Sequence, residues 1–142
     1  MDKYDRIFVI TAFGIQLVLL IYFILRKANF DFALRWGWIV YALTIPALVV
    51  SVLMLRSGKS ISFWLGGLLL TAWGLFGYII DIAKPISWRS PPYLPVFIPY
   101  VLLYLSAQLF YWFPVGMIQR GFWYFYAVLF FASTYFNITS HQ

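Results

Sequence analysis

Five uncharged, apolar runs occupy most of this 142-residue chain, and the basic residues lie between them or at their ends. The runs cover residues 7–25, 36–55, 61–80, 93–117 and 121–138. About 18 or more consecutive apolar residues are enough for a helix to cross the roughly 30 Å hydrocarbon core of a bilayer. The sequence therefore predicts an all-α, polytopic integral membrane helical bundle with about five transmembrane helices.

The same pattern predicts a single transmembrane domain over residues 1–142, with helices near 7–25, 36–55, 61–83, 93–114 and 121–138. The connectors between these helices are short, so none can bury a core of its own, and we expect no soluble catalytic or receptor domain. Function is then expected inside the bundle, at its rims or on its lipid-facing surface.

The distribution of charge bears on partners and on orientation. The formal net charge is +6, but the ten basic residues are scattered over both predicted membrane faces, which argues against a nucleic-acid partner and favours a role as interfacial anchors. Five basic residues fall on each face. The end of the first helix is followed by Arg26, Lys27 and Arg35, which favours an N-terminus outside and a C-terminus in the cytoplasm of a cell-membrane protein.

The chain lacks the side chains that many catalytic mechanisms and metal sites require. The chain has no cysteine or glutamate, its one histidine is His141 next to the terminus, and its four acids are Asp2, Asp5, Asp31 and Asp81. A zinc, di-iron or bis-histidine haem site has no ligand set, and a paired-carboxylate mechanism has no second positioned acid. We therefore expect no metal, no cofactor and no catalytic residue. The residue content favours a protein that is not an enzyme over one that is.

One candidate ligand site is a polar stripe in the fourth predicted helix. Three phenols and one amide recur there at helical spacing: Tyr100, Tyr104, Gln108 and Tyr111. An amide facing lipid is costly, so this stripe should face the bundle interior, with Gln16 and Thr71 as expected partners of Gln108. The stripe, together with Gln16, could line a cavity for a flat apolar ligand such as a quinone, a sterol-like lipid or a pigment. The alternative is a purely structural set of hydrogen bonds to Gln16, Thr71 or Ser133.

The helix at 61–83 carries small residues on one face, including Gly67, Thr71 and Gly74, and this face ends at Asp81. Small residues allow close helix contact in lipid, so we expect this helix to be the central one.

A second candidate site follows at the end of that helix. Asp81 is expected to contact Lys84, Arg89 or Arg35. Together with Trp88, Asp81, Lys84 and Arg89 form either a structural ion pair or a site for a lipid headgroup, because arginine suits a lipid phosphate.

These observations favour a small non-catalytic integral membrane protein, either an accessory subunit of a membrane complex or a binder of an apolar ligand within the bundle. The alternative is a small transporter or lipid flippase, which requires a continuous polar path lined by Gln16, Tyr104 and Gln108 with Asp81 or Arg89 at a mouth. The expected partners are membrane lipids and other membrane-protein subunits or an apolar small molecule.

Overall fold

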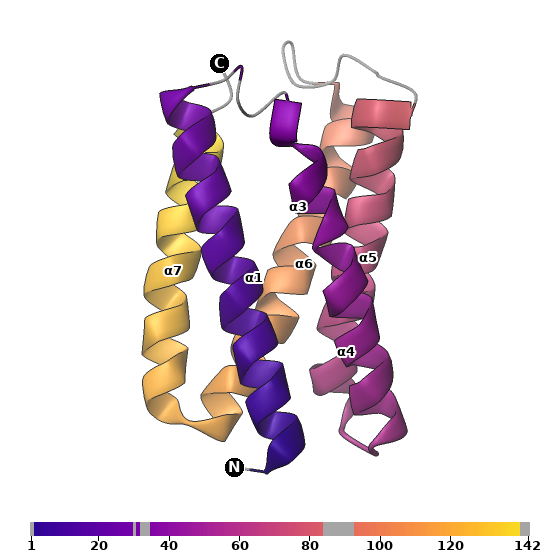
Figure 1. The fold of residues 1–142 in the computed structure, drawn as a ribbon, viewed down its shortest axis with the longest axis vertical. Coiled ribbons are helices and arrows are strands. Elements are labelled where there is room, and N and C mark those ends of the chain that lie inside the picture. The colour runs from indigo at the N-terminus through magenta and orange to yellow at the C-terminus, as the bar shows by residue number, and fades with distance from the viewer. Residues whose placement is uncertain (1, 30, 32–34, 84–92, 140–142) are drawn as a thin grey trace.

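The computed structural model describes residues 2–29, 31, 35–83 and 93–139, and these residues form helices and no strand. The helices are α1 (Lys3–Ala28), α3 (Trp38–Ala42), α4 (Thr44–Arg56), α5 (Ile61–Tyr78), the π-helical turn η1 (Ile79–Ala83), α6 (Leu94–Ile118) and α7 (Arg120–Thr139). Helices α3 and α4 form one irregular rod and η1 extends α5, so the bundle has five long rods (Figure 1). The predicted all-α bundle is confirmed.

The rods pack side by side in the order α1, α7, α6, α5 and α4, and α1 makes smaller contacts with α4 and α6 (Figure 1). Helix α1 begins at one end of the bundle and α7 finishes at the other. We call these the N-terminal end and the C-terminal end. Helix α6 is the element shared by two groups, α1/α6/α7 and α4/α5/α6.

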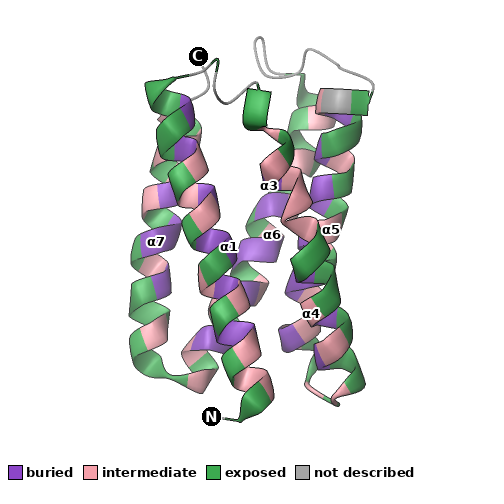
Figure 2. Ribbon diagram, viewed as in Figure 1, coloured by how far each residue is buried: buried purple, intermediate pink, exposed green. Residues whose placement is uncertain are grey.

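Four helices are long and apolar enough to cross a membrane: Lys3–Ala28, Trp38–Arg56, Ile61–Asp81 and Leu94–Ile118. The fifth rod, α7, spans 20 residues but falls outside this group. Large apolar side chains such as Ile10, Ile45 and Val128 are about two-thirds or more exposed, and Figure 2 shows such exposed positions over the outside of the bundle. Water would oppose this arrangement and hydrocarbon permits it, so the four apolar helices indicate a membrane-embedded protein.

Helix α5 is the most enclosed of the four candidate spans, with 44% of its apolar window buried against 39% for α1. The burial predicted for this segment is present, but its predicted central position is wrong, because α6 is the helix that contacts both groups. Glycine allows the close packing, because a methyl group at position 67 would lie only 1.7 Å from Ser51 Oγ and 2.6 Å from the Ala47 carbonyl oxygen. Gly74 and Gly77 are crowded in the same way by Thr44 and Tyr41. We call this contact between α5 and α3/α4 the glycine seam.

A proline accounts for the break between α3 and α4. Pro46 has no N–H to donate to the carbonyl of Ala42, and α3 ends at that residue. The Thr44 hydroxyl donates a 2.8 Å hydrogen bond to the Tyr41 carbonyl beside the break. The rod is therefore interrupted one turn before the proline itself.

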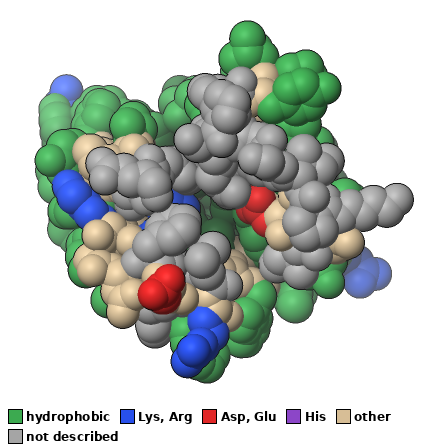
Figure 3. Space-filling model, turned by 90° about the horizontal axis from the view of Figure 1, so that it is seen from above, with side chains coloured by type: hydrophobic (Ala, Val, Ile, Leu, Met, Phe, Trp, Pro, Cys, Tyr) green, Lys and Arg blue, Asp and Glu red, His purple; other side chains and the backbone are tan. Residues whose placement is uncertain are grey.

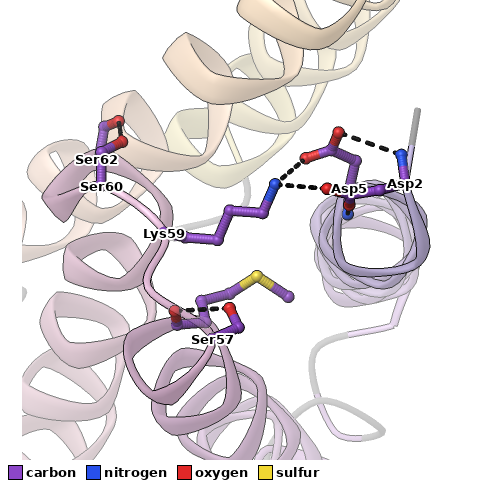
Figure 4. A network of polar contacts seen from close by, with 7 residues as sticks. Asp2, Asp5, Ser57, Lys59, Ser60 and Ser62 are labelled. Atoms are coloured by element: carbon purple, nitrogen blue, oxygen red, sulfur yellow. Dashed lines mark hydrogen bonds and ion pairs between the residues drawn. The ribbon is translucent and has the colours of Figure 1, made fainter.

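The start of α1 is fixed by a capping box. Asp2 accepts a 2.8 Å hydrogen bond from the Asp5 backbone, and the Asp5 side chain bonds back to the Asp2 backbone, so α1 begins four residues before the predicted position 7. Both carboxylates also bind Lys59 Nζ, at 3.0 and 2.9 Å (Figure 4). This ion-pair cluster ties α1 to the turn between α4 and α5.

One predicted boundary is wrong. Pro114 does not end the fourth helix, because α6 continues through it to Ile118 and buries Pro114. Pro114 cannot donate a hydrogen bond to the Phe110 carbonyl. That stretch of backbone lies against α5 at Gly66, where an added methyl group would lie 3.1 Å from the carbonyl carbon and 3.2 Å from the oxygen of Phe110.

Candidate functional site

A buried polar cluster joins α1, α6 and α7 near the middle of the bundle. It consists of Gln16, Gln108, Tyr126 and Ser133, all of which are fully or almost fully buried. Gln16 Nε2 donates to Ser133 Oγ and, at 3.3 Å, to the Leu129 carbonyl. Ser133 in turn donates to the Phe130 carbonyl at 3.0 Å. These acceptors orient the Gln16 amide so that its oxygen faces Tyr126.

Tyr126 links the two amides. Its hydroxyl lies 2.6 Å from Gln108 Oε1 and 3.3 Å from Gln16 Oε1, so its single proton is shared unequally and mainly serves Gln108. The expectation of a direct bond between Gln108 and Gln16 is therefore wrong, because a phenol from α7 bridges them. The expected partner Thr71 is wrong as well, since its hydroxyl donates to the Gly67 carbonyl of its own helix at 2.8 Å.

The polar stripe of α6 faces inward as its spacing predicts. Tyr104, Gln108 and Tyr111 are buried, and Tyr100 is half-buried. Tyr111 stacks on Phe8 of α1 with ring centroids 5.6 Å apart. The stripe thus divides along its length into two parts. The part nearer the N-terminal end of the bundle contacts α1 and α7, and the part nearer the C-terminal end faces α5.

Three buried groups on α5 and α6 have no hydrogen-bond partner among the described residues: Trp73 Nε1, the Tyr104 hydroxyl and Gln108 Nε2. We call them the three buried donors, since indole and amide N–H groups can only donate and a phenol can donate. Each such group left unmatched in an apolar interior opposes folding by about 1–3 kcal/mol. Trp73 and Tyr104 contact each other, with ring centroids 5.5 Å apart, and Gln108 lies one helical turn from Tyr104.

An aromatic cluster surrounds Trp73. The rings of Tyr41, Tyr100 and Tyr104 lie with centroids 5.5, 5.6 and 5.5 Å from the Trp73 ring, at tilted angles. The Tyr41 ring also lines a surface groove of about 360 Å³ between α3/α4 and α5. The groove therefore leads from the lipid-facing surface to a ring that touches Trp73.

Asp81 lies in the π-helical turn at the C-terminal end, where α5 finishes. Its carboxylate accepts a hydrogen bond from the Tyr41 hydroxyl, which is also 3.5 Å from the Tyr100 hydroxyl. Among the described residues, the ion pairs join Lys59 to Asp2 and Asp5, so the expected contact of Asp81 with Arg35 is not among them. Lys84, Trp88 and Arg89, the other members of this candidate site, lie outside the described residues.

Arg26 is a buried cation, although its position at the end of an apolar run predicts an interfacial anchor. Its guanidinium donates to the Asn137 carbonyl at 3.1 Å and to Asn137 Oδ1 at 2.6 Å, and it lies 4.9 Å from the Phe23 ring centroid. The sequence carries a signal for a polar partner on α7, because Tyr126, Ser133 and Asn137 share one face of that helix.

Viewed from the C-terminal end, the molecule shows hydrophobic side chains around much of its outline, with charged side chains between them (Figure 3).

Two chemical properties follow from this geometry. The part of the chain that the structure describes holds no group of three or more histidine, cysteine or carboxylate side chains that could bind a metal ion. The interior instead offers hydrogen-bond donors beside aromatic rings, which suits recognition of an apolar molecule with acceptor atoms. Comparison of the chain with protein-family models, curated proteins and solved structures finds no match.

Proposed function

We propose that this protein is a non-catalytic membrane protein that binds an apolar ligand inside its bundle, at the interface of α5 and α6. The three buried donors carry the proposal. In a protein interior nearly every buried donor has an acceptor. Of the four buried polar groups without a partner among the described residues, three lie on the adjacent helices α5 and α6 and the fourth is the Thr134 hydroxyl on α7. The grouping of three on α5 and α6 favours an acceptor supplied from outside the chain. The aromatic cluster around Trp73 would provide flat contact area for such a ligand.

The groove beside Tyr41 supports a lateral route for this ligand. It opens toward lipid between α3/α4 and α5 and is lined by aromatic rings and by the hydroxyl-bearing residues Thr44 and Thr71. A molecule dissolved in the bilayer would reach Tyr41 from there and Trp73 behind it. An apolar ligand with carbonyl-type acceptors fits both the path and the donors.

The test is gentle solubilisation followed by mass spectrometry of the small molecules that co-purify. Tyr104→Phe and Gln108→Leu should each reduce retention of the ligand at least about tenfold, because each removes a hydrogen bond in a water-free site. Tyr111→Phe is the matched control, since it removes a buried phenol of the same stripe that is not one of the three buried donors.

Thermal stability separates ligand binding from a purely structural role. Replacing an unmatched buried polar group by an apolar one of similar shape is neutral or stabilising in ligand-free protein. Tyr104→Phe should therefore raise or preserve the melting temperature of protein from which bound small molecules have been removed. The same variant should no longer be stabilised when the molecules that co-purify with wild type are added back. Loss of stability in the stripped protein, with no co-purifying molecule in the wild type, would refute the proposal.

A second candidate function, an accessory subunit of a membrane complex, is favoured by α7. This helix is not among the four apolar spans, yet it exposes Tyr124, Phe131 and Tyr135. Phenols on an outward face are better matched by a protein partner than by acyl chains. If this function is correct, Tyr124→Ala with Tyr135→Ala should release a stoichiometric partner protein from the solubilised wild-type complex.

We further propose a location in the cell membrane with the N-terminus outside and the C-terminus in the cytoplasm. The flanks of the first helix support this orientation. The natural chain has no cysteine, so single cysteines report cleanly on topology. In intact cells, a membrane-impermeant maleimide should label Lys3→Cys and should label Thr139→Cys only after permeabilisation. The reverse pattern would invert the orientation.

A further inference from the structure

An aromatic groove of about 520 Å³ opens on the outer surface between α6 and α7. It is lined by Leu109, Phe110, Trp112, Phe113 and Trp123. The volume lies within the range of small-molecule sites, and the lining is apolar. This groove is separate from the three buried donors, so an argument about it does not depend on the proposed function.

The walls of this groove are held in place by specific contacts. Trp112 Nε1 donates a 3.1 Å hydrogen bond to the Trp123 carbonyl, and the two indole rings lie with centroids 5.1 Å apart. Trp123 reaches this position because residue 116 is glycine. A methyl group there would lie 2.5 Å from Trp123 Cδ1. The groove is therefore a built feature of the α6/α7 contact and not a chance gap between side chains.

A positive charge lies on the same side of α7 as Trp123, which lines the groove. Arg120 opens α7 at the N-terminal end, is exposed, and precedes Trp123 by three residues, which places both on one side of the helix. Within the described part of the chain, the acids at this end are Asp2 and Asp5, and both bind Lys59. These acids therefore leave the charge of Arg120 available to an anion.

We propose that this groove binds an anionic phospholipid, with one acyl chain against Trp112 and Trp123 and the phosphate on Arg120. The charge complementarity selects this occupant over a neutral lipid. A guanidinium can bind two phosphate oxygens at once, and the positive end of the α7 dipole adds to the attraction. The apolar groove alone would accept any acyl chain, so Arg120 is the residue that distinguishes headgroups.

The experiment compares two lipids with identical acyl chains, phosphatidylglycerol and phosphatidylcholine, added to delipidated protein and counted by native mass spectrometry. Wild type should retain phosphatidylglycerol about fivefold more than phosphatidylcholine, the effect of one basic residue at an anionic surface. Arg120→Gln should abolish the preference. Arg56→Gln is the matched control, because Arg56 is an exposed arginine at the same end and distant in sequence from the groove.

A second variant tests the groove independently of the charge. Gly116→Ala should displace Trp123 and reduce retention of both lipids, with unchanged helix content by circular dichroism. Equal retention of the two lipids by wild type would overturn the proposal, as would an equal loss of preference in Arg120→Gln and Arg56→Gln. A wild-type dimer that Gly116→Ala converts to monomer, with lipid retention unchanged, would instead assign the groove to a second copy of the chain and also overturn it.

Discussion

The two sides of α6 are held by different kinds of contact. Toward α1 and α7, helices meet through side-chain hydrogen bonds, with Gln16 bonded to Ser133 and Arg26 bonded to Asn137. In the glycine seam, α5 meets α3/α4 through backbone approach at Gly67 and Gly74. In lipid the hydrophobic effect does not draw helices together, so polar bonds and close packing are the two available means. The contact between α1 and α7 relies on the first means, and the glycine seam relies on the second.

The difference has a consequence for how each side responds to change. A hydrogen bond between side chains can lose one partner and leave the helices at the same separation, whereas a side chain added to a close backbone contact forces the helices apart. The seam should therefore be sensitive to added atoms, and the α1/α7 side should be sensitive to lost ones.

The largest effect is expected from Gly67→Ala. The added methyl group would meet Ser51 Oγ and the Ala47 carbonyl, and backbone cannot rotate away as a side chain can. We expect a loss of about 1–3 kcal/mol in the free energy of unfolding, measured by denaturation in detergent. Gly14→Ala is the control, because no atom lies within 4 Å of the added methyl group. It should be neutral or stabilising by up to about 1 kcal/mol, since alanine favours helix. Equal effects at the two positions would show that the glycine seam is no more sensitive to added atoms than an open helix surface.

A smaller effect is expected from Gln16→Leu, which removes the bonds to Ser133 and to the Leu129 carbonyl and the minor share of the Tyr126 proton. Membrane hydrogen bonds average about 0.6 kcal/mol, so the total loss should be near 1 kcal/mol. A double-mutant cycle with Ser133→Ala should show coupling of about 0.6 kcal/mol. A cycle between Gln16→Leu and Ser51→Ala should show none. Coupling of the same size in both cycles would mean that the two sides do not respond independently.

The smallest effect concerns the ion-pair cluster that links the two sides at the N-terminal end. The Asp5 backbone N–H and then Lys59 lower the pKa of Asp2 below its usual 3.8. A carboxylate with a lowered pKa contributes stability above its unfolded pKa, and the contribution is lost as pH falls through the folded value. The protection factor against hydrogen exchange in the first turn of α1, which corrects the measured rate for the intrinsic pH dependence of amide exchange, should therefore fall as the pH drops below about 4. Asp2→Asn should show the lower protection factor at neutral pH already. A protection factor that is independent of pH in wild type would show that the cluster does not hold α1.

The amino-acid sequence predicts where the helices lie better than it predicts which helices contact each other. Uncharged runs bounded by basic residues indicate which segments span the hydrocarbon core. The five rods therefore lie close to the predicted ranges. Pro114 misled the prediction because neighbouring helices in a membrane protein support a proline that would end an isolated helix. The π-helical turn at 79–83 has no local signal of comparable strength.

The candidate site shows the same limit. The inward face of α6 follows from the spacing of Tyr104, Gln108 and Tyr111. The role of Tyr126 does not, because the rotation of α7 against α1 is set by packing over the whole helix. Residues 16 and 126 are distant in sequence, and a single sequence does not indicate which faces of two helices meet.

The proline within α6 constrains what residue α5 can carry opposite it. Without an N–H from Pro114, the Phe110 carbonyl is not drawn into its own helix, and Gly66 is the residue that lies against it. Pro114→Ala would restore the missing donor and draw that oxygen back toward the α6 axis, which eases the contact with the oxygen but leaves the contacts with the carbonyl carbon and Cβ of Phe110 at 3.1 Å. Gly66→Ala should therefore be less harmful in the Pro114→Ala background than in the natural chain. The effects of the two substitutions should accordingly be non-additive, so that the order in which they are made changes the cost of the first step.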